Sequence, residues 1–280
     1  MEPYISKNVE LAIARMAEDS KAKGFTDVFM WFMFMATDVI SEASFAGNFG
    51  VLRAEFPLFF KTMQRVPFGP SKEIMRSIFR TRAYADESIQ RYWKQLQADP
   101  DNVKTTLLTK EYAEVENGTI PADQLIRDAH GNIVAGTDTT AVTATYAIWF
   151  LAQDTRIQQA LIEEVSTLPD GFKDNDLRSL RVMGGVLNET LRLRSAIGGS
   201  LPRLVPPGGA QFCGYFIPEK TVVGIPTWTM HRDPAVMQDP ERFDPSRWYE
   251  PTKDMLHNFL PFGGGSRGEH FYLTSAFRVV

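Results

Sequence analysis

The sequence has 280 residues, of which 44% are hydrophobic and 12% aromatic, so the chain can bury a large core and is not a disordered segment. Its formal net charge is -4, with 30 basic and 34 acidic residues scattered along the chain, which argues against a nucleic-acid partner. The single cysteine, Cys213, excludes an intrachain disulfide and a cysteine-rich zinc site, and indicates a reducing compartment.

The N-terminal region predicts neither a signal peptide nor a membrane anchor, because charges are mixed throughout its first 20 residues. The longest apolar block, Val28–Ala36, is far shorter than the roughly 20 residues that a membrane-spanning helix needs. We therefore expect residues 25–40 to form a buried core helix. We also expect the chain to be cytoplasmic and monomeric.

Hydrophobic periodicity predicts helices at residues 84–96, 123–152, 157–166 and 180–193. The helix at 123–152 is long and apolar on most sides, as expected of a helix through the middle of a domain. Glycines and prolines crowd residues 198–209, β-like pieces follow at 211–217 and 221–226, and residues 234–251 are rich in proline and aromatic side chains. The pattern predicts one mainly α domain, residues 1–280, with a minor β part.

The first motif that could carry chemistry is Ala135-Gly136-Thr137-Asp138-Thr139-Thr140, inside the long helix. A glycine there costs about 1 kcal/mol relative to alanine, which implies a reason such as close approach by a ligand or another backbone. A hydroxyl of Thr139 or Thr140 can bond back to a carbonyl one turn earlier. The motif taken alone favours a simple helix-packing contact with Asp138 on a solvated face.

The second motif is Glu189-Thr190-Leu191-Arg192, whose spacing places a carboxylate and a guanidinium on one helix face. The same spacing at Glu73-Ile74-Met75-Arg76 shows that the pattern also arises by chance. Arg242, in Pro240-Glu241-Arg242-Phe243, could join Glu189 and Arg192 in a buried network. The alternative is an ordinary surface ion pair.

The third motif is the glycine-rich loop Pro261-Phe262-Gly263-Gly264-Gly265-Ser266-Arg267. A phosphate-binding loop is excluded, because no lysine follows and no helix N-terminus is predicted after it.

The order of the three motifs, with Pro202-Arg203 and His231-Arg232-Asp233-Pro234 between them, resembles the cytochrome P-450 family of haem-thiolate monooxygenases, in its fungal form. The resemblance extends to about residue 267. It implies a partial P-450 fold in which the long helix crosses over the haem. It also implies that complete relatives oxidise an apolar small molecule with dioxygen and electrons from a reductase, in secondary metabolite biosynthesis.

The resemblance also assigns roles to residues. Asp138 and Thr139 would relay protons to iron-bound dioxygen, and Glu189, Arg192 and Arg242 would form a structural triad. The haem propionates and the porphyrin would be contacted by Arg203, Phe262, Gly265 and Arg267. Ala135 and Ile197 would face the substrate.

The chain departs from the family where the haem ligand belongs. The family's loop runs F-x-x-G-x-R-x-C, and counting from Phe262 places Glu269 at the cysteine position. Cys213 is far upstream between β-like pieces, where we expect a buried, inert thiol. Residues 268–280 do not resemble the family's next helix, and the start of the family's domain, including its endoplasmic-reticulum anchor, has no counterpart. No metal ligand is therefore assigned.

Three interpretations remain open at this point. The first is a haem-dependent monooxygenase, and the second is a catalytically inactive remnant or binding protein, because the proximal cysteine is absent. The second is expected for this chain as written. The third is a helical interaction module that uses exposed apolar surface. Binding of haem separates the three.

Overall fold

The computed structural model describes residues 2–53, 86–99 and 102–264. It divides into two compact units, Met1–Val142 and Thr143–Val280, which we call the first and second units. Helices dominate both, and the strands form two small antiparallel sheets, so the predicted mainly α class with a minor β part is confirmed. The prediction that residues 1–280 form a single domain stays a prediction.

The first unit begins with two helices, α1 (Glu2–Lys23) and α2 (Val28–Phe45). The Asp27 side chain caps α2 by accepting the Met30 N–H at 3.1 Å, which satisfies one of the free donors of the first turn. Ala12 of α1 and Phe34 of α2 are buried together in one core cluster with Leu52. The helix expected at 25–40 is present, but it begins three residues later, at Val28, and extends five residues further, to Phe45.

By length and composition alone, α2 is long and apolar enough to cross a membrane. Core helices of soluble proteins can be equally long and apolar, and 44% of the apolar window of α2 is buried in the structure. The helix also carries a buried carboxylate. Asp38 is 1% exposed and accepts the N–H groups of Val51 and Leu52 at 2.9 and 3.0 Å. Burial raises the pKa of Asp38, and the two N–H groups oppose that rise. Asp38 therefore holds the chain that follows α2 against the helix.

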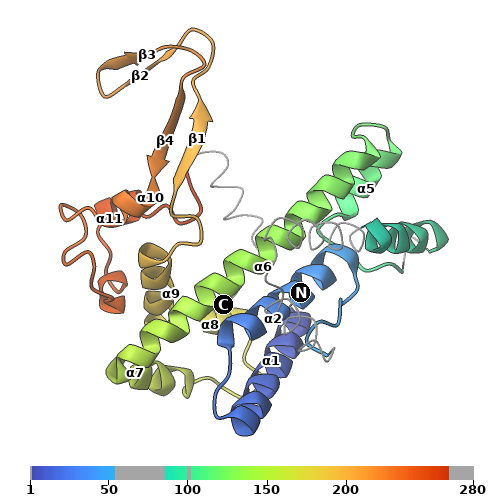
Figure 1. Cartoon of the computed structure of the whole chain (residues 1–280), viewed down its shortest axis with the longest axis horizontal. Helices are drawn as coiled ribbons and strands as arrows, with labels where there is room; N and C mark the ends of the chain where they lie inside the picture. The colour runs from blue at the N-terminus through green and yellow to red at the C-terminus, as the bar shows by residue number, and fades with distance from the viewer. Residues whose placement is uncertain (1, 54–85, 100–101, 265–280) are drawn as a thin grey trace, which may run out of the picture. The chain divides into compact units, whose positions relative to one another are not determined.

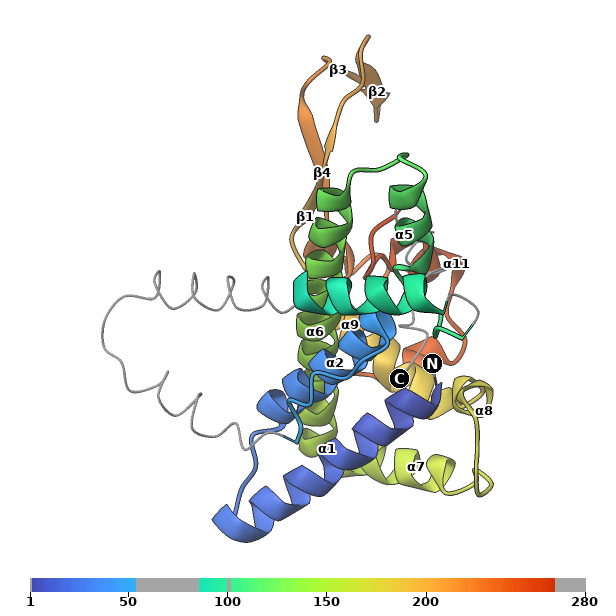
Figure 2. The same cartoon turned by 90° about the vertical axis from the view of Figure 1, so that its right-hand side faces the viewer.

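A second cluster of the first unit gathers around the start of α6 (Ala122–Gln153), which matches the predicted helix at 123–152. α5 (Thr109–Glu116) lies beside the first turns of α6 (Figures 1 and 2). Helical residues 86–98 complete the packing, and the cluster consists of Phe45, Ile89, Tyr92, Leu108, Tyr112, Leu125, Ala129 and Ile133.

Close helix packing explains the glycine in the middle of α6. A Cβ on Gly136 would lie 2.7 Å from Cγ1 of Ile40 on α2, closer than carbon atoms can approach. Next to it, the hydroxyls of Thr37 and Thr137 are 3.4 Å apart. The close approach at Gly136 is therefore made by the side chain of Ile40 on α2, and not by the backbone of another segment.

The second unit contains α7 (Thr155–Val165), α8 (Asp174–Arg178), α9 (Arg181–Leu193), α10 (Thr227–Met230), the 3-10 helix η1 (Pro245–Trp248) and α11 (Lys253–Asn258). Glu164 of α7 accepts the N–H groups of Val182 and Met183 at 2.8 and 2.9 Å, which anchors the start of α9. α9 then packs directly on η1, since a Cβ on Gly185 would lie 2.6 Å from the Pro245 carbonyl oxygen.

The strands form a twisted ribbon, with a smaller hairpin at its far end (Figure 1). β1 (Ser200–Leu204) pairs antiparallel with β4 (Val222–Pro226), in the register that places Pro202 opposite Gly224. β2 (Ala210–Phe212) and β3 (Tyr215–Ile217) form the hairpin. β1 was not predicted, because its five residues all lie within the stretch 198–209, whose glycines and prolines indicate a loop.

The hairpin also overturns the expectation for the only cysteine. Cys213 and Gly214 form its two-residue turn with φ of 50° and 84°. Tight turns of this kind project their side chains outward, and Cys213 is exposed rather than buried.

Candidate functional site

The pair Glu189 and Arg192 forms the centre of a buried polar network in the second unit. The two side chains lie one turn apart on α9 and make two parallel hydrogen bonds, at 2.8 and 2.9 Å. Both side chains are 0% exposed. A fully buried ion pair is retained only when its remaining hydrogen-bonding groups are satisfied, so its other partners decide its role.

Three further donors reach the Glu189 carboxylate. Nε of Arg247 and the backbone N–H of Asp244 bind one oxygen, each at 2.9 Å, and Nε1 of Trp248 binds the other at 2.9 Å. All three donors come from the segment that contains η1. The carboxylate thus fixes this segment, whose own structure is irregular, to the face of α9.

The Arg192 guanidinium binds carbonyl groups on its outer side. Nη1 donates to the carbonyl oxygens of His231 and Pro240 at 2.8 and 2.7 Å, and Nη2 donates to that of Arg242 at 3.2 Å. Charge-assisted bonds of this kind are about twice as strong as neutral ones. One side chain therefore ties α9 to two later segments.

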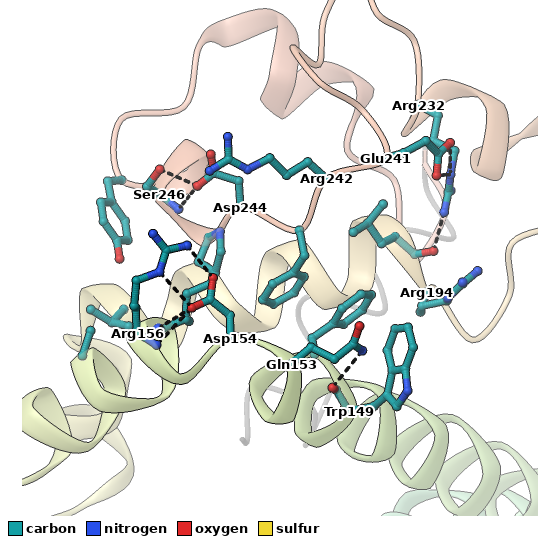
Figure 3. Close-up of a pocket in the computed structure, with 18 residues that line it drawn as sticks. Trp149, Gln153, Asp154, Arg156, Arg194, Arg232, Glu241, Arg242, Asp244 and Ser246 are labelled. Carbon is teal, nitrogen blue, oxygen red and sulfur yellow. Dashed lines mark hydrogen bonds and ion pairs between the residues drawn. The ribbon is translucent and has the colours of Figure 1, made fainter.

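Arg242 was predicted as the third member of the network, but its side chain does not take part in the network. Arg242 contributes only its carbonyl oxygen, while its guanidinium extends alongside Asp244 and Ser246 in an exposed position (Figure 3). Arg247 takes the predicted place, with its side chain 10% exposed. The sequence contained the signal, because Pro245-Ser246-Arg247-Trp248 repeats the P-x-R-aromatic pattern of Pro240-Glu241-Arg242-Phe243.

His231 is a member of the site that the sequence analysis did not single out. It is 0% exposed, and burial, with Arg192 and Arg232 nearby, lowers its pKa to about 4. Its Nδ1 lies 3.2 Å from the Arg192 carbonyl oxygen, and its Nε2 accepts the Leu260 N–H at 2.9 Å. His231 thus connects the network to the chain that enters the glycine-rich loop.

The motif on α6 has a buried side in the first unit, with Gly136 and Thr137, and an accessible side. Ala135 and Asp138 are exposed. Thr139 donates its hydroxyl hydrogen to the Ala135 carbonyl oxygen at 2.7 Å, the one-turn back-bond that the sequence suggests. The proton-relay roles of Asp138 and Thr139 remain predictions.

The remaining predicted site residues are distributed over the ribbon and loops of the second unit. Arg203 is half-buried on β1 and donates to the Pro202 carbonyl oxygen at 2.9 Å. Ile197 is 54% exposed and Phe262 is half-buried. The predictions for Gly265, Arg267 and Glu269 lie outside the described residues, which end at 264.

A crevice of about 590 Å³ lies beside this network, between the end of α6, α7 and the segment 241–249 (Figure 3). Its floor is aromatic, with Phe150 and Phe243 stacked at 4.2 Å between ring centroids. Of its three acids, Asp154 and Glu241 already pair with Arg156 and Arg232, at 3.0 and 3.1 Å, and Asp244 accepts the Ser246 N–H at 3.1 Å. The crevice therefore offers no carboxylate poised for acid or base chemistry from Asp154 or Glu241.

Known proteins match this chain over nearly its whole length. The family described as Cytochrome P450 matches residues 1–268. "Cytochrome P450 monooxygenase orf2" of Aspergillus niger is 37% identical over 95% of this chain and 59% of its own length. "Cytochrome P450 monooxygenase azaI" of the same species is 34% identical over 95% of this chain and 66% of the relative.

A more distant relative, "Cytochrome P450 monooxygenase stcB" of Emericella nidulans, is 27% identical over 95% of this chain and 56% of its own length. The chain thus spans roughly three fifths of the length of these curated relatives. The buried Glu189–Arg192–Arg247 network and the match over residues 1–268 lead to one conclusion: the chain belongs to the cytochrome P450 family.

Proposed function

We propose that the chain functions in a haem-dependent monooxygenase of the fungal P450 type, which oxidises an apolar small molecule in secondary metabolite biosynthesis. The observation that carries the proposal is the continuous family match over residues 1–268. The relatives that support it have names that describe P450 monooxygenases.

The family implies haem, and the residues present fit it only in part. The network around Glu189 is complete, and Arg203 and Phe262 are available on a strand and a loop. The axial ligand does not fit, because Glu269 stands at the cysteine position and a carboxylate does not donate electron density as a thiolate does. Cys213 lies in an exposed hairpin turn, and the described residues contain no His, Cys, Asp and Glu cluster suited to a metal.

The presence of Glu269 at the cysteine position also favours a second candidate function. Without a thiolate, the chain would be a catalytically inactive member of the family that binds the apolar molecule without oxidising it. Both candidates share the substrate class, for which Ala135 and Ile197 are the proposed contacts. The active candidate requires a reductase as electron donor. We propose a monomer with no nucleic-acid partner, in the cytosol or on its membrane face.

The reduced carbon-monoxide difference spectrum separates the two candidates. The chain is expressed with a haem supply in a Cys213→Ser background, in which the only cysteine is removed. Glu269→Cys is compared with the background and with Glu269→Ser, which has similar volume but cannot form a thiolate. A thiolate-type band restricted to Glu269→Cys supports the P450 active site and shows that the natural chain lacks only its ligand.

Two other outcomes decide differently. A thiolate-type band in the natural chain that disappears in Cys213→Ser would assign the ligand to Cys213 and support the active candidate. Folded protein without haem in every variant would leave the non-catalytic candidate.

A further inference from the structure

His231 joins three parts of the second unit that are distant in the sequence. It follows α10 directly, its ring lies between the end of α9 and residues 259–261, and it is 0% exposed. Its own carbonyl oxygen accepts from Nη1 of Arg192 at 2.8 Å, while its Nδ1 meets the carbonyl of that same arginine. The backbone and the side chain of His231 are therefore both attached to Arg192.

The partners of the ring determine which nitrogen carries the proton. The Leu260 N–H can only donate, so Nε2 must accept and carries no hydrogen. The Arg192 carbonyl can only accept, so Nδ1 must carry the hydrogen. Burial first, and then the positive charges of Arg192 and Arg232, oppose a second proton on the ring. His231 is thus a neutral imidazole with its hydrogen on Nδ1.

Leu260 is the point at which the glycine-rich loop begins. Its N–H is bound by His231, and its carbonyl oxygen accepts the Gly263 N–H at 3.1 Å, which closes a turn over residues 260–263. Within this turn the Pro261 carbonyl accepts from the Ser195 hydroxyl at 3.3 Å. Gly263 has φ of 78°, a backbone conformation that favours glycine, and a Cβ there would lie 2.9 Å from Cδ1 of Leu201, whose side chain would have to shift.

We infer that His231 is a positioning residue, which fixes the start of the glycine-rich loop relative to the Glu189–Arg192 pair. It does so through two directional bonds of opposite polarity, and no other described side chain links α9 to Leu260 in this way. The inference goes beyond the proposed function and stands independently of haem, because both bonds join groups of the polypeptide alone.

The experiment combines nitrogen-15 NMR of the histidine rings with amide hydrogen exchange at Leu260. The chain has only four histidines, so the ring signals of His231 can be assigned with one substitution. We expect the natural chain at pH 7 to show a neutral ring with hydrogen on Nδ1. The position of the ring hydrogen is measured on the natural chain itself.

Two matched substitutions then separate the two bonds. In His231→Gln, the side-chain oxygen can occupy the position of Nε2 and accept in its place. In His231→Asn, the shorter side chain can replace only the donor at Nδ1. We expect Leu260 exchange to stay within about twofold of the natural chain in His231→Gln and to accelerate about tenfold in His231→Asn, as loss of one hydrogen bond predicts. The Met237 N–H, bonded to the Asp233 carbonyl at 2.8 Å, is the internal reference.

A ring with hydrogen on Nε2, or a charged ring at pH 7, would overturn the inference whatever the variants do. The inference would also be overturned if the Leu260 amide exchanged at the same rate in the natural chain and in His231→Asn while exchange of the Met237 amide was unchanged. Neither outcome bears on whether the chain binds haem, so the proposed function is tested separately.

Discussion

The identity of the third arginine in the buried network gives the most direct test of the structure. Arg247→Ala removes a side chain that donates to Glu189 at 2.9 Å and to the Gln238 carbonyl at 2.9 Å. Arg242→Ala is the matched control. It removes the same side chain from the neighbouring P-x-R-aromatic run, where the carbonyl that binds Arg192 remains in place.

The expected magnitudes follow from burial and partners. Loss of a hydrogen bond to a buried charged group costs about 1.5–3 kcal/mol, and the loss of packed methylene groups adds to it, so Arg247→Ala should lower the free energy of unfolding by about 3 kcal/mol. The Glu189 carboxylate keeps Arg192, Trp248 and the Asp244 N–H, which limits the loss. Arg242→Ala removes an exposed side chain and should cost less than about 0.5 kcal/mol.

Equilibrium unfolding in urea, followed by circular dichroism and by tryptophan fluorescence, measures both variants. Trp248, one of the five tryptophans of the chain, donates to Glu189 and contributes part of this signal from the network. A double-mutant cycle of Arg247→Ala with Glu189→Gln isolates the pairwise energy, which should be at least about 1 kcal/mol for groups in direct contact.

A larger loss for Arg242→Ala than for Arg247→Ala would refute the assignment of the third arginine. A coupling energy below about 0.5 kcal/mol between Glu189 and Arg247 would show that their contact contributes packing but no specific bond.

Stability against pH and two backbone sites provide further tests. Because the pKa of His231 is about 4 in the folded chain and roughly 6.5 when unfolded, its contribution is complete above pH 6.5 and is lost as pH falls toward 4. Urea unfolding should show a loss of about 2 kcal/mol between pH 7 and 5 that His231→Gln lacks. Gly136→Ala should destabilise the first unit by about 1 kcal/mol through its clash with Ile40, and the sign should reverse in an Ile40→Ala background. Ala46→Gly should raise the thermal midpoint by relieving a φ of 51°, for a gain of about 0.5–1 kcal/mol.

Local sequence features were sufficient for the helices expected at 25–40, 84–96, 123–152, 157–166 and 180–193, whereas α1 and α5 were not predicted. Apolar periodicity over many turns gave α6 nearly to the residue, and the Asp27 cap and the fixed spacing of Glu189 and Arg192 are properties of single helices. The prediction missed β1 for a local reason, because the proline of this strand and the glycines around it have low strand propensity. Only pairing with β4 makes it a strand.

Tertiary structure decided which distant groups complete each local pattern. Arg242 and Arg247 occupy equivalent positions in two similar motifs, and only the packing of η1 on α9 brings the second to Glu189. His231 belongs to the run His231-Arg232-Asp233-Pro234 that contributes to the family resemblance, but the sequence assigned it no role, because its partners lie 39 residues before and 29 residues after it. The sequence by itself therefore determined the family, five of the helical segments and the absence of cysteine at position 269. The partners of each buried polar group depended on the folded chain, because a hydrogen bond is specified by direction and distance and not by order along the sequence.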